Sequence, residues 1–176
     1  VQSEATKRAG SFAGFKQIVL LQESIAAAIA YGFLNQKNES WLVYDLGGGT
    51  FDVALVASRD GSLIVLAHAG DNFLGGKAFD AAIIEKLILP SLVAQGIVLD
   101  STIQSRIFSY LKELAESAKI ELTAKDKTTI DIDIQIDQLC IQHSMEISRK
   151  DLLESCKFLL DKTMHLCKKT ISDAKV

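Results

Sequence analysis

A glycine-rich segment between two aspartates is the part of the sequence best suited to chemistry. It reads Asp45-Leu-Gly-Gly-Gly-Thr-Phe-Asp52 and joins two segments that we expect to be strands. Glycines without Cβ let backbone N–H groups approach phosphate oxygens, and the Thr50 hydroxyl beside them can orient a water or a phosphoryl oxygen. Asp45 and Asp52 supply hard oxygen ligands that suit Mg²⁺ through its retained waters. The alternative is a glycine-rich hairpin with solvated aspartates.

Fewer observations support the other candidates for chemistry. Glu23 follows the apolar run Ile18 to Leu21, so it could be a third carboxylate near the same metal, although a single glutamate at a helix start is usually an electrostatic cap. His68, His143 and His165 lie on different expected elements without acidic or cysteine partners at ligand spacing. The histidines therefore support neither a zinc site nor a nucleophilic triad.

A polar face on a long expected helix could contact a ligand. With about 100° per residue, Glu116, Lys119 and Thr123 fall within about 60° of one another, opposite the apolar side. Periodicity alone favours an ordinary solvated face with an i,i+3 ion pair. Ile120 beside this face is apolar where solvent is expected. It could instead flank a planar ligand such as the purine of a nucleoside, with the charged groups hydrogen-bonding the ribose of that nucleoside.

The elements that must position these residues begin with strands. Ile18 to Leu21 predict a short buried strand, followed by an alanine-rich helix that ends at Gly32. Polar residues 36–40 are a candidate crossover between lobes. Three more strands are predicted at Trp41 to Asp45, Asp52 to Ala57 and Leu63 to Ala69. Their short connections predict an antiparallel meander.

The second half alternates helices with a hairpin. Gly75 and Gly76 precede a helical pattern from Phe79 to Leu89, which Pro90 should kink or end. The helix from Thr102 to Leu122 has an apolar stripe. The stripe comprises Ile103, Ile107, Tyr110, Leu111, Leu114, Ala118 and Leu122. Alternating apolar residues then predict a hairpin with one buried face: Ile130, Ile132, Ile134 and Ile136, then Leu139, Ile141, Met145 and Ile147 beyond Asp137 and Gln138.

The last expected element is an amphipathic helix. Ser148 to Asp151 resemble a capping box at its start. Its apolar side comprises Leu152, Cys156, Leu159, Leu160, Met164, Cys167 and Ile171. At the other end of the chain, Val1 to Gly14 reads like the middle of a helix, so we expect an excised fragment.

Composition excludes several classes of protein. The 176 residues are 48% hydrophobic and 23% charged, with a net charge of −3 from interspersed acids and bases, which indicates no nucleic-acid surface. No apolar run approaches the ~20 residues of a membrane span, and no leader is evident. Cys140, Cys156 and Cys167 are not placed as CxxC and predict buried, reduced thiols. A cytoplasmic location is expected.

Four segments resemble successive signatures of the 70-kilodalton heat-shock chaperones, in that family's order and spacing. They are Ser24-Ile-Ala-Ala-Ala-Ile-Ala-Tyr-Gly32, Tyr44-Asp-Leu-Gly-Gly-Gly-Thr-Phe-Asp-Val53, Ala69-Gly-Asp-Asn-Phe-Leu-Gly-Gly-Lys-Ala-Phe-Asp80 and Glu116-Ser-Ala-Lys-Ile-Glu-Leu122. The resemblance covers the whole chain. The triple-glycine loop is shared with actin and sugar kinases, whereas the last two segments are specific to the chaperones.

The resemblance implies an α/β actin-like ATPase fold, which is ribonuclease H-like, with a mixed sheet and a helical outer sub-domain that carries a β-hairpin. Most of the chain would be lobe II. Residues 1–34 would be the remainder of lobe I, residues 35–74 and 153–176 the central sub-domain of lobe II, and residues 75–152 its outer sub-domain.

The resemblance also implies roles in binding ATP or ADP with Mg²⁺. Asp45, Asp52 and Glu23 match acids near the metal. Thr50 matches a residue beside the hydrolytic water. The catalytic candidates are Asp45, Glu23 and Thr50. The phosphates would lie on Gly47, Gly48, Gly49 and Thr50, near the hinge glycines Gly75 and Gly76. The adenosine contacts would be Glu116, Lys119, Ile120 and Thr123, which reverses the preference for an ordinary solvated face.

Departures from the family pattern indicate a divergent member. Ile120 stands where many relatives have arginine, Ser24 where proline is usual, and Lys77 where an acid is common. The sequence contains no DLGTT-like phosphate loop, no lobe I catalytic lysine and no GGSSR-like segment. We therefore expect this chain alone to bind nucleotide weakly and to hydrolyse little, since phosphoryl transfer depends on charges positioned around the γ-phosphate.

The function expected from the resemblance is that of an ATP-binding fragment of a stress-response chaperone, in which nucleotide controls affinity for unfolded client peptides held by another domain. J-domain co-chaperones and nucleotide-exchange factors are the implied partners. Two alternatives are a sugar kinase or exopolyphosphatase with the same loop, and a relative that binds nucleotide without hydrolysing it.

Overall fold

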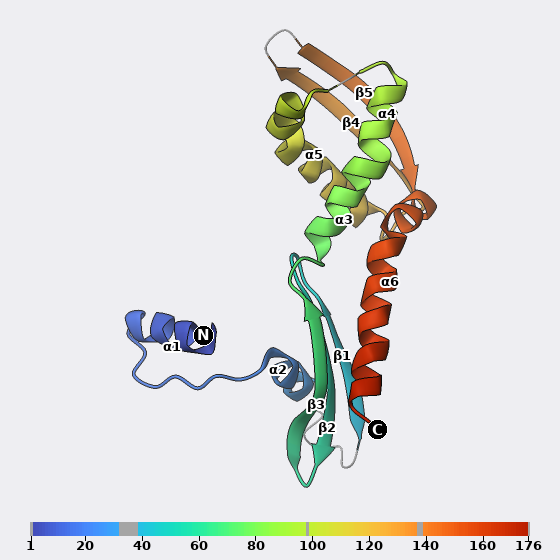
Figure 1. Ribbon diagram of the computed structural model, residues 1–176. Helices are drawn as coiled ribbons and strands as arrows, with labels where there is room; N and C mark the ends of the chain where they lie inside the picture. Colours follow the sequence, from blue (N-terminus) through green and yellow to red (C-terminus); the bar gives the residue numbers. More distant parts are fainter. Residues whose placement is uncertain (1, 32–38, 98, 137–138, 176) are drawn as a thin grey trace. The chain divides into compact units, whose positions relative to one another are not determined.

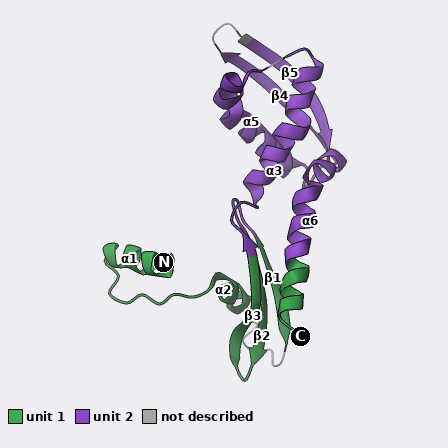
Figure 2. Ribbon diagram, viewed as in Figure 1, with its two compact units in different colours: residues 1–45, 52–69, 167–176 green, residues 46–51, 70–166 purple. Residues whose placement is uncertain are grey.

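The structure is a computed structural model that describes residues 2–31, 39–97, 99–136 and 139–175. It is a mixed α/β structure that divides into two compact units, coloured separately in Figure 2. Unit 1 comprises residues 1–45, 52–69 and 167–176, and unit 2 comprises residues 46–51 and 70–166. Among the described residues, no helix is long and apolar enough to cross a membrane.

Unit 1 contains the body of a three-stranded sheet (Figure 1). Strands β1 (Ser40–Leu46), β2 (Phe51–Arg59) and β3 (Ser62–Asp71) lie in the order β1-β2-β3, which confirms the predicted meander. Asp60 and Gly61, between β2 and β3, both have positive φ (51° and 77°). Two positive φ values make a tight turn whose twist matches that of the strands, and they explain the glycine.

The core of unit 1 lies between β2 and α2 (Glu23–Ala30), with Ala28, Ala54 and Val56 buried together. Helix α1 (Gln2–Phe12) forms where a helix was predicted. The predicted strand Ile18 to Leu21 is wrong: these residues have no strand assignment, and Val19 is 90% exposed. An apolar run becomes a strand only where a neighbouring strand supplies hydrogen bonds, and the described residues provide none there. Of the candidate crossover, residues 36–38 lie outside the described residues.

Unit 2 begins with one helical run in three parts. Helix α3 (Gly76–Ile83) continues through a π-helical turn (Ile84–Ile88) into α4 (Leu89–Ala94). Pro90 therefore does not end the run. It lies in the first turn of α4, where a missing N–H is tolerated, and the π turn just before it changes the hydrogen-bond register.

Helix α5 (Ser101–Glu121) packs its apolar stripe against a hairpin. The Asp100 carboxylate caps α5 by accepting a hydrogen bond of 2.8 Å from the Ile103 N–H. Strands β4 (Lys127–Ile136) and β5 (Leu139–Ser148) pair antiparallel, from Lys127 opposite Ser148 to Ile136 opposite Leu139. The buried residues of this core confirm both predicted patterns. They include Ile83, Ile88, Leu92, Ile107, Leu111, Ala118, Leu122, Ile130, Ile132, Ile134, Ile141 and Ile147. Residues 137–138 lie outside the described residues.

Helix α6 (Arg149–Asp173) begins with the predicted capping box. The Ser148 N–H and hydroxyl both donate to the Asp151 carboxylate, at 2.8 and 2.6 Å. These hydrogen bonds lower the pKa of Asp151 below its usual value. The Arg149 side chain also donates to the carbonyls of Leu122 (2.9 Å) and Lys125 (3.0 Å), just beyond the end of α5.

The predicted apolar side of α6 is partly wrong. Met164 and Ile171 are about half exposed, whereas Thr163 and Thr170 are buried. Threonine is tolerated there because its hydroxyl can bond to its own helix, as Thr163 does to the Leu160 carbonyl at 2.8 Å. Hydrophobicity alone therefore misplaced these two positions by one residue, whereas the predicted burial of Cys156, Leu159 and Cys167 is confirmed.

The three cysteines are unbridged, as predicted, but only Cys156 and Cys167 are buried. Burial raises the pKa of both thiols. Cys140 is exposed on β5, so the prediction of a buried thiol is wrong for this residue. Its position on the outer face of the hairpin follows from strand alternation, since Ile141 beside it is buried.

Candidate functional site

The triple-glycine segment forms a tight turn between β1 and β2. The Gly47 N–H donates to the Thr50 carbonyl at 2.9 Å, which closes the turn. A Cβ placed on Gly48 or Gly49 would meet no atom within 4 Å, so the backbone there faces open space. Such a turn presents backbone to any molecule that enters that space, as a phosphate-binding loop must.

A second glycine pair packs onto this turn. The Gly76 N–H donates to the Gly47 carbonyl at 2.9 Å, and the Lys77 N–H donates to the Gly48 carbonyl at 2.8 Å. A Cβ on Gly75 would lie 2.6 Å from the Gly49 nitrogen and 2.7 Å from the Gly47 carbonyl oxygen. Gly75 has an extended φ of −172°, so it is needed for the close approach and not for its conformation. The structure thus joins two predicted parts of the site that lie far apart in the sequence.

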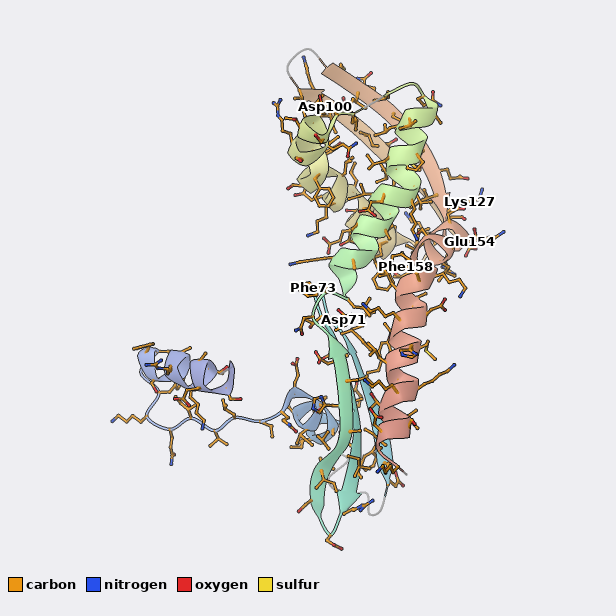
Figure 3. All side chains as sticks on the ribbon, in the orientation of Figure 1. Asp71, Phe73, Asp100, Lys127, Glu154 and Phe158 are labelled. Carbon is orange, nitrogen blue, oxygen red and sulfur yellow. The ribbon has the colours of Figure 1, made fainter. Side chains whose placement is uncertain are left out.

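The segment before Gly75 is fixed by Asp71, a residue that the sequence did not single out. The Asp71 carboxylate accepts a hydrogen bond of 2.8 Å from the Phe73 N–H and forms an ion pair with Lys162 on α6. The contact with Lys162, followed by that with Phe73, lowers the pKa of Asp71. Figure 3 shows Asp71 and Phe73 at the end of β3, just before α3. Aspartate is common in turns because its carboxylate can accept a hydrogen bond from the backbone N–H two residues further on. An aspartate at the end of an expected strand was therefore the sequence signal that could have identified Asp71.

Lys119 on α5 reaches the same glycine pair. Its Nζ lies 2.5 Å from the Asp80 Oδ1 and 3.4 Å from the Gly76 carbonyl oxygen. The ion pair expected in the ordinary interpretation of the polar face, between Lys119 and Glu116, is therefore replaced by one between α5 and α3. Asp80 is only 2% exposed. An aspartate beside apolar Phe79, Ala81 and Ala82 was the available sequence signal for a buried partner.

The rest of the polar face on α5 is open. Glu116, Ile120 and Thr123 are exposed, and Ile120 retains 60% of its surface. The Thr123 hydroxyl donates to the Ile120 carbonyl at 2.7 Å at the end of the helix. An isoleucine this exposed gives the face an apolar area beside two polar side chains. Whether these residues contact a nucleoside stays a prediction.

The three carboxylates of the expected metal site lie in unit 1. Glu23, Asp45 and Asp52 are exposed and line one cavity of about 740 Å³, together with Tyr44 and His68. Within the described part of the chain, no three His, Cys, Asp or Glu side chains are grouped closely enough to hold a metal ion directly. A Mg²⁺ ion held through its own waters does not require such a group, so the metal site stays a prediction.

These observations define a class of protein: a mixed α/β protein in which a glycine-rich β-turn and a second glycine pair at a helix start form one backbone surface. The family described as "Hsp70 protein" matches residues 1–176. The chain therefore belongs to the Hsp70 family, which confirms the resemblance found in the sequence. This membership also removes the sugar kinase alternative.

Named relatives agree with this assignment. The chain is 38% identical to "Chaperone protein dnaK" of Trieres chinensis and 38% identical to that of Thalassiosira pseudonana, over 99% of its length. It is 40% identical to "Chaperone protein DnaK" of Carsonella ruddii (strain PV), also over 99% of its length. The chain spans 28%, 29% and 30% of these three relatives.

Proposed function

We propose that this chain belongs to the ATP-binding domain of a molecular chaperone, in which bound nucleotide controls affinity for unfolded client peptides. The observation that carries the proposal is the docking of Gly75 and Gly76 onto the turn formed by Gly47 to Thr50. In a chain of the Hsp70 family, this surface is the natural place for the phosphates of ATP or ADP. We further propose the actin-like fold and the lobe boundaries that the resemblance implies.

The phosphates would be held by backbone atoms. The open side of Gly48 and Gly49 leaves room for phosphate oxygens beside the main chain. The Thr50 hydroxyl, exposed at the end of the same turn, would orient the water that attacks the γ-phosphate. Because the turn is fixed by hydrogen bonds to Gly76 and Lys77, its donors would need little rearrangement on binding.

Exposed carboxylates fit a Mg²⁺ ion held through water. Asp45 and Asp52 flank the turn in sequence, and Glu23 lines the same cavity as both. A bound Mg²⁺ would neutralise charge on the phosphate oxygens. The three side chains would orient the ion's waters by accepting their hydrogen bonds. Asp45 and Glu23 are the residues that we propose act closest to the hydrolytic water.

The nucleoside would lie against α5. Ile120 offers apolar area for a purine plane, and its packing would replace the cation–π contact that arginine makes in many relatives. Glu116, Lys119 and Thr123 would bond the ribose and the base. We also propose a cytoplasmic location and the partners that the resemblance implies: J-domain co-chaperones, nucleotide-exchange factors and unfolded peptides.

Calorimetry with MgATP and MgADP on the full-length protein tests the proposal. Asp45→Ala should weaken Mg²⁺-dependent binding or hydrolysis, while Asp131→Ala, an exposed aspartate on the hairpin, should leave both unchanged. Unchanged activity in Asp45→Ala would remove Asp45 from the site. Binding without turnover in the wild-type protein would favour the non-hydrolysing alternative.

A further inference from the structure

We propose that Asp80 is a positioning residue for the nucleotide: it holds the Lys119 ammonium group at the rim of the site and prepares it to bond a neutral hydroxyl of the ligand. This inference rests on the proposed nucleotide site. It concerns a residue that makes no expected contact with nucleotide itself.

Burial is the first argument. Asp80 is 2% exposed, whereas the side chain of Lys119 is 24% exposed. A buried carboxylate is costly unless a charged partner compensates it, so Asp80 requires Lys119. The partially exposed lysine can at the same time face solvent or a ligand. In this ion pair Asp80 is therefore held in the interior, while Lys119 remains accessible.

Hydrogen-bond capacity is the second argument. An ammonium group has three N–H donors. Asp80 accepts from Lys119 at 2.5 Å, and the Gly76 carbonyl oxygen lies at 3.4 Å from the same nitrogen. A group with three donors can serve these two acceptors and one ligand atom. Without Asp80, the long lysine side chain would lose its strongest anchor, and fixing it on binding would cost rotamer entropy.

Charge is the third argument. The carboxylate at 2.5 Å neutralises much of the lysine charge, so the pair offers a directed hydrogen bond more than a positive field. That property suits an uncharged acceptor such as a ribose hydroxyl, while phosphate charge would be met at the glycine turn. Gly76 links the two regions, because its carbonyl faces Lys119 and its N–H bonds the Gly47 carbonyl.

A double-mutant cycle in the full-length protein tests this role. MgADP affinity is measured by calorimetry for wild type, Asp80→Asn, Lys119→Gln and the double variant. We expect each single variant to bind at least about tenfold more weakly, the loss typical of a hydrogen bond to a charged group. If Asp80 acts through Lys119, the double variant binds no more weakly than either single variant. Glu85→Gln, an exposed acid on the same helical run, is the matched control and should bind like wild type.

A second measurement uses 2′,3′-dideoxy-ADP and needs no lysine variant. Wild type should bind it much more weakly than ADP, and this difference between the two nucleotides should be clearly smaller in Asp80→Asn, where only the ribose bonds of the other residues on α5 remain. Losses that multiply in the double variant, or a ribose preference as large in Asp80→Asn as in wild type, would overturn the role of Asp80. A wild-type protein that binds neither nucleotide would instead refute the proposed function.

Discussion

Replacing Gly75 with alanine should separate the two glycine-lined segments from each other. The new Cβ would lie 2.6 to 2.7 Å from three backbone atoms of Gly47 and Gly49, none of which can move as a flexible side chain could. Overpacking of this kind costs about 1–3 kcal/mol. If the segments part, the hydrogen bonds from the Gly76 and Lys77 N–H groups are also lost, at about 1 kcal/mol each. We expect a total loss of about 3–5 kcal/mol in local stability.

Amide hydrogen exchange measures this loss directly, because the Gly76 and Lys77 N–H groups are the donors concerned. In Gly75→Ala both amides should exchange at least tenfold faster than in wild type. Gly48→Ala is the matched control: its Cβ meets nothing within 4 Å, so exchange should not change, although nucleotide binding should weaken if phosphate lies there. Wild-type exchange rates in Gly75→Ala would refute the argument that close approach requires this glycine.

Two further predictions concern packing and charge. Ile107→Ala removes a side chain that is 2% exposed, so it should lower the free energy of unfolding, measured by chemical denaturation, by about 2–5 kcal/mol. Ile120→Ala, at 60% exposure, should lower it by under about 0.5 kcal/mol and yet weaken nucleotide binding. Equal destabilisation by the two variants would contradict the packing. The Ser148 hydrogen bonds lower the pKa of Asp151 in the folded state. The contribution of this carboxylate to the stability of the fold is therefore complete above its usual pKa of 3.8 and is lost as the pH falls through the lowered value. Asp151→Asn should therefore flatten the pH dependence of denaturation in that acid range, and a curve parallel to wild type would refute this.

The sequence predicted well those elements whose signals are local. Alternating isoleucines located the hairpin and its buried face, and Ser148 with Asp151 located the start of α6. The motifs also located the glycine turn and its second glycine pair. Each of these depends on residues close together in the chain, where periodicity and turn chemistry act.

Features that depend on distant partners were not predicted. Nothing near Lys119 in the sequence indicates that its ion pair lies on another helix, at Asp80. The apolar run Ile18 to Leu21 satisfied the strand pattern, but pairing is set by neighbours and not by the run itself. The burial of Thr163 in place of Met164 likewise depends on what packs against α6. The π turn at Ile84–Ile88, just before Pro90, was not predicted either.

Arg149 links the start of α6 to the end of α5. Its backbone starts α6, while its guanidinium group bonds the Leu122 and Lys125 carbonyls just beyond the end of α5. Fraying at either end would release the arginine and leave the other end with unsatisfied carbonyls or a loosened first turn. The two ends should therefore open as one cooperative unit. A disturbance at the end of α5, where we propose that the nucleoside lies, would then also loosen the start of α6.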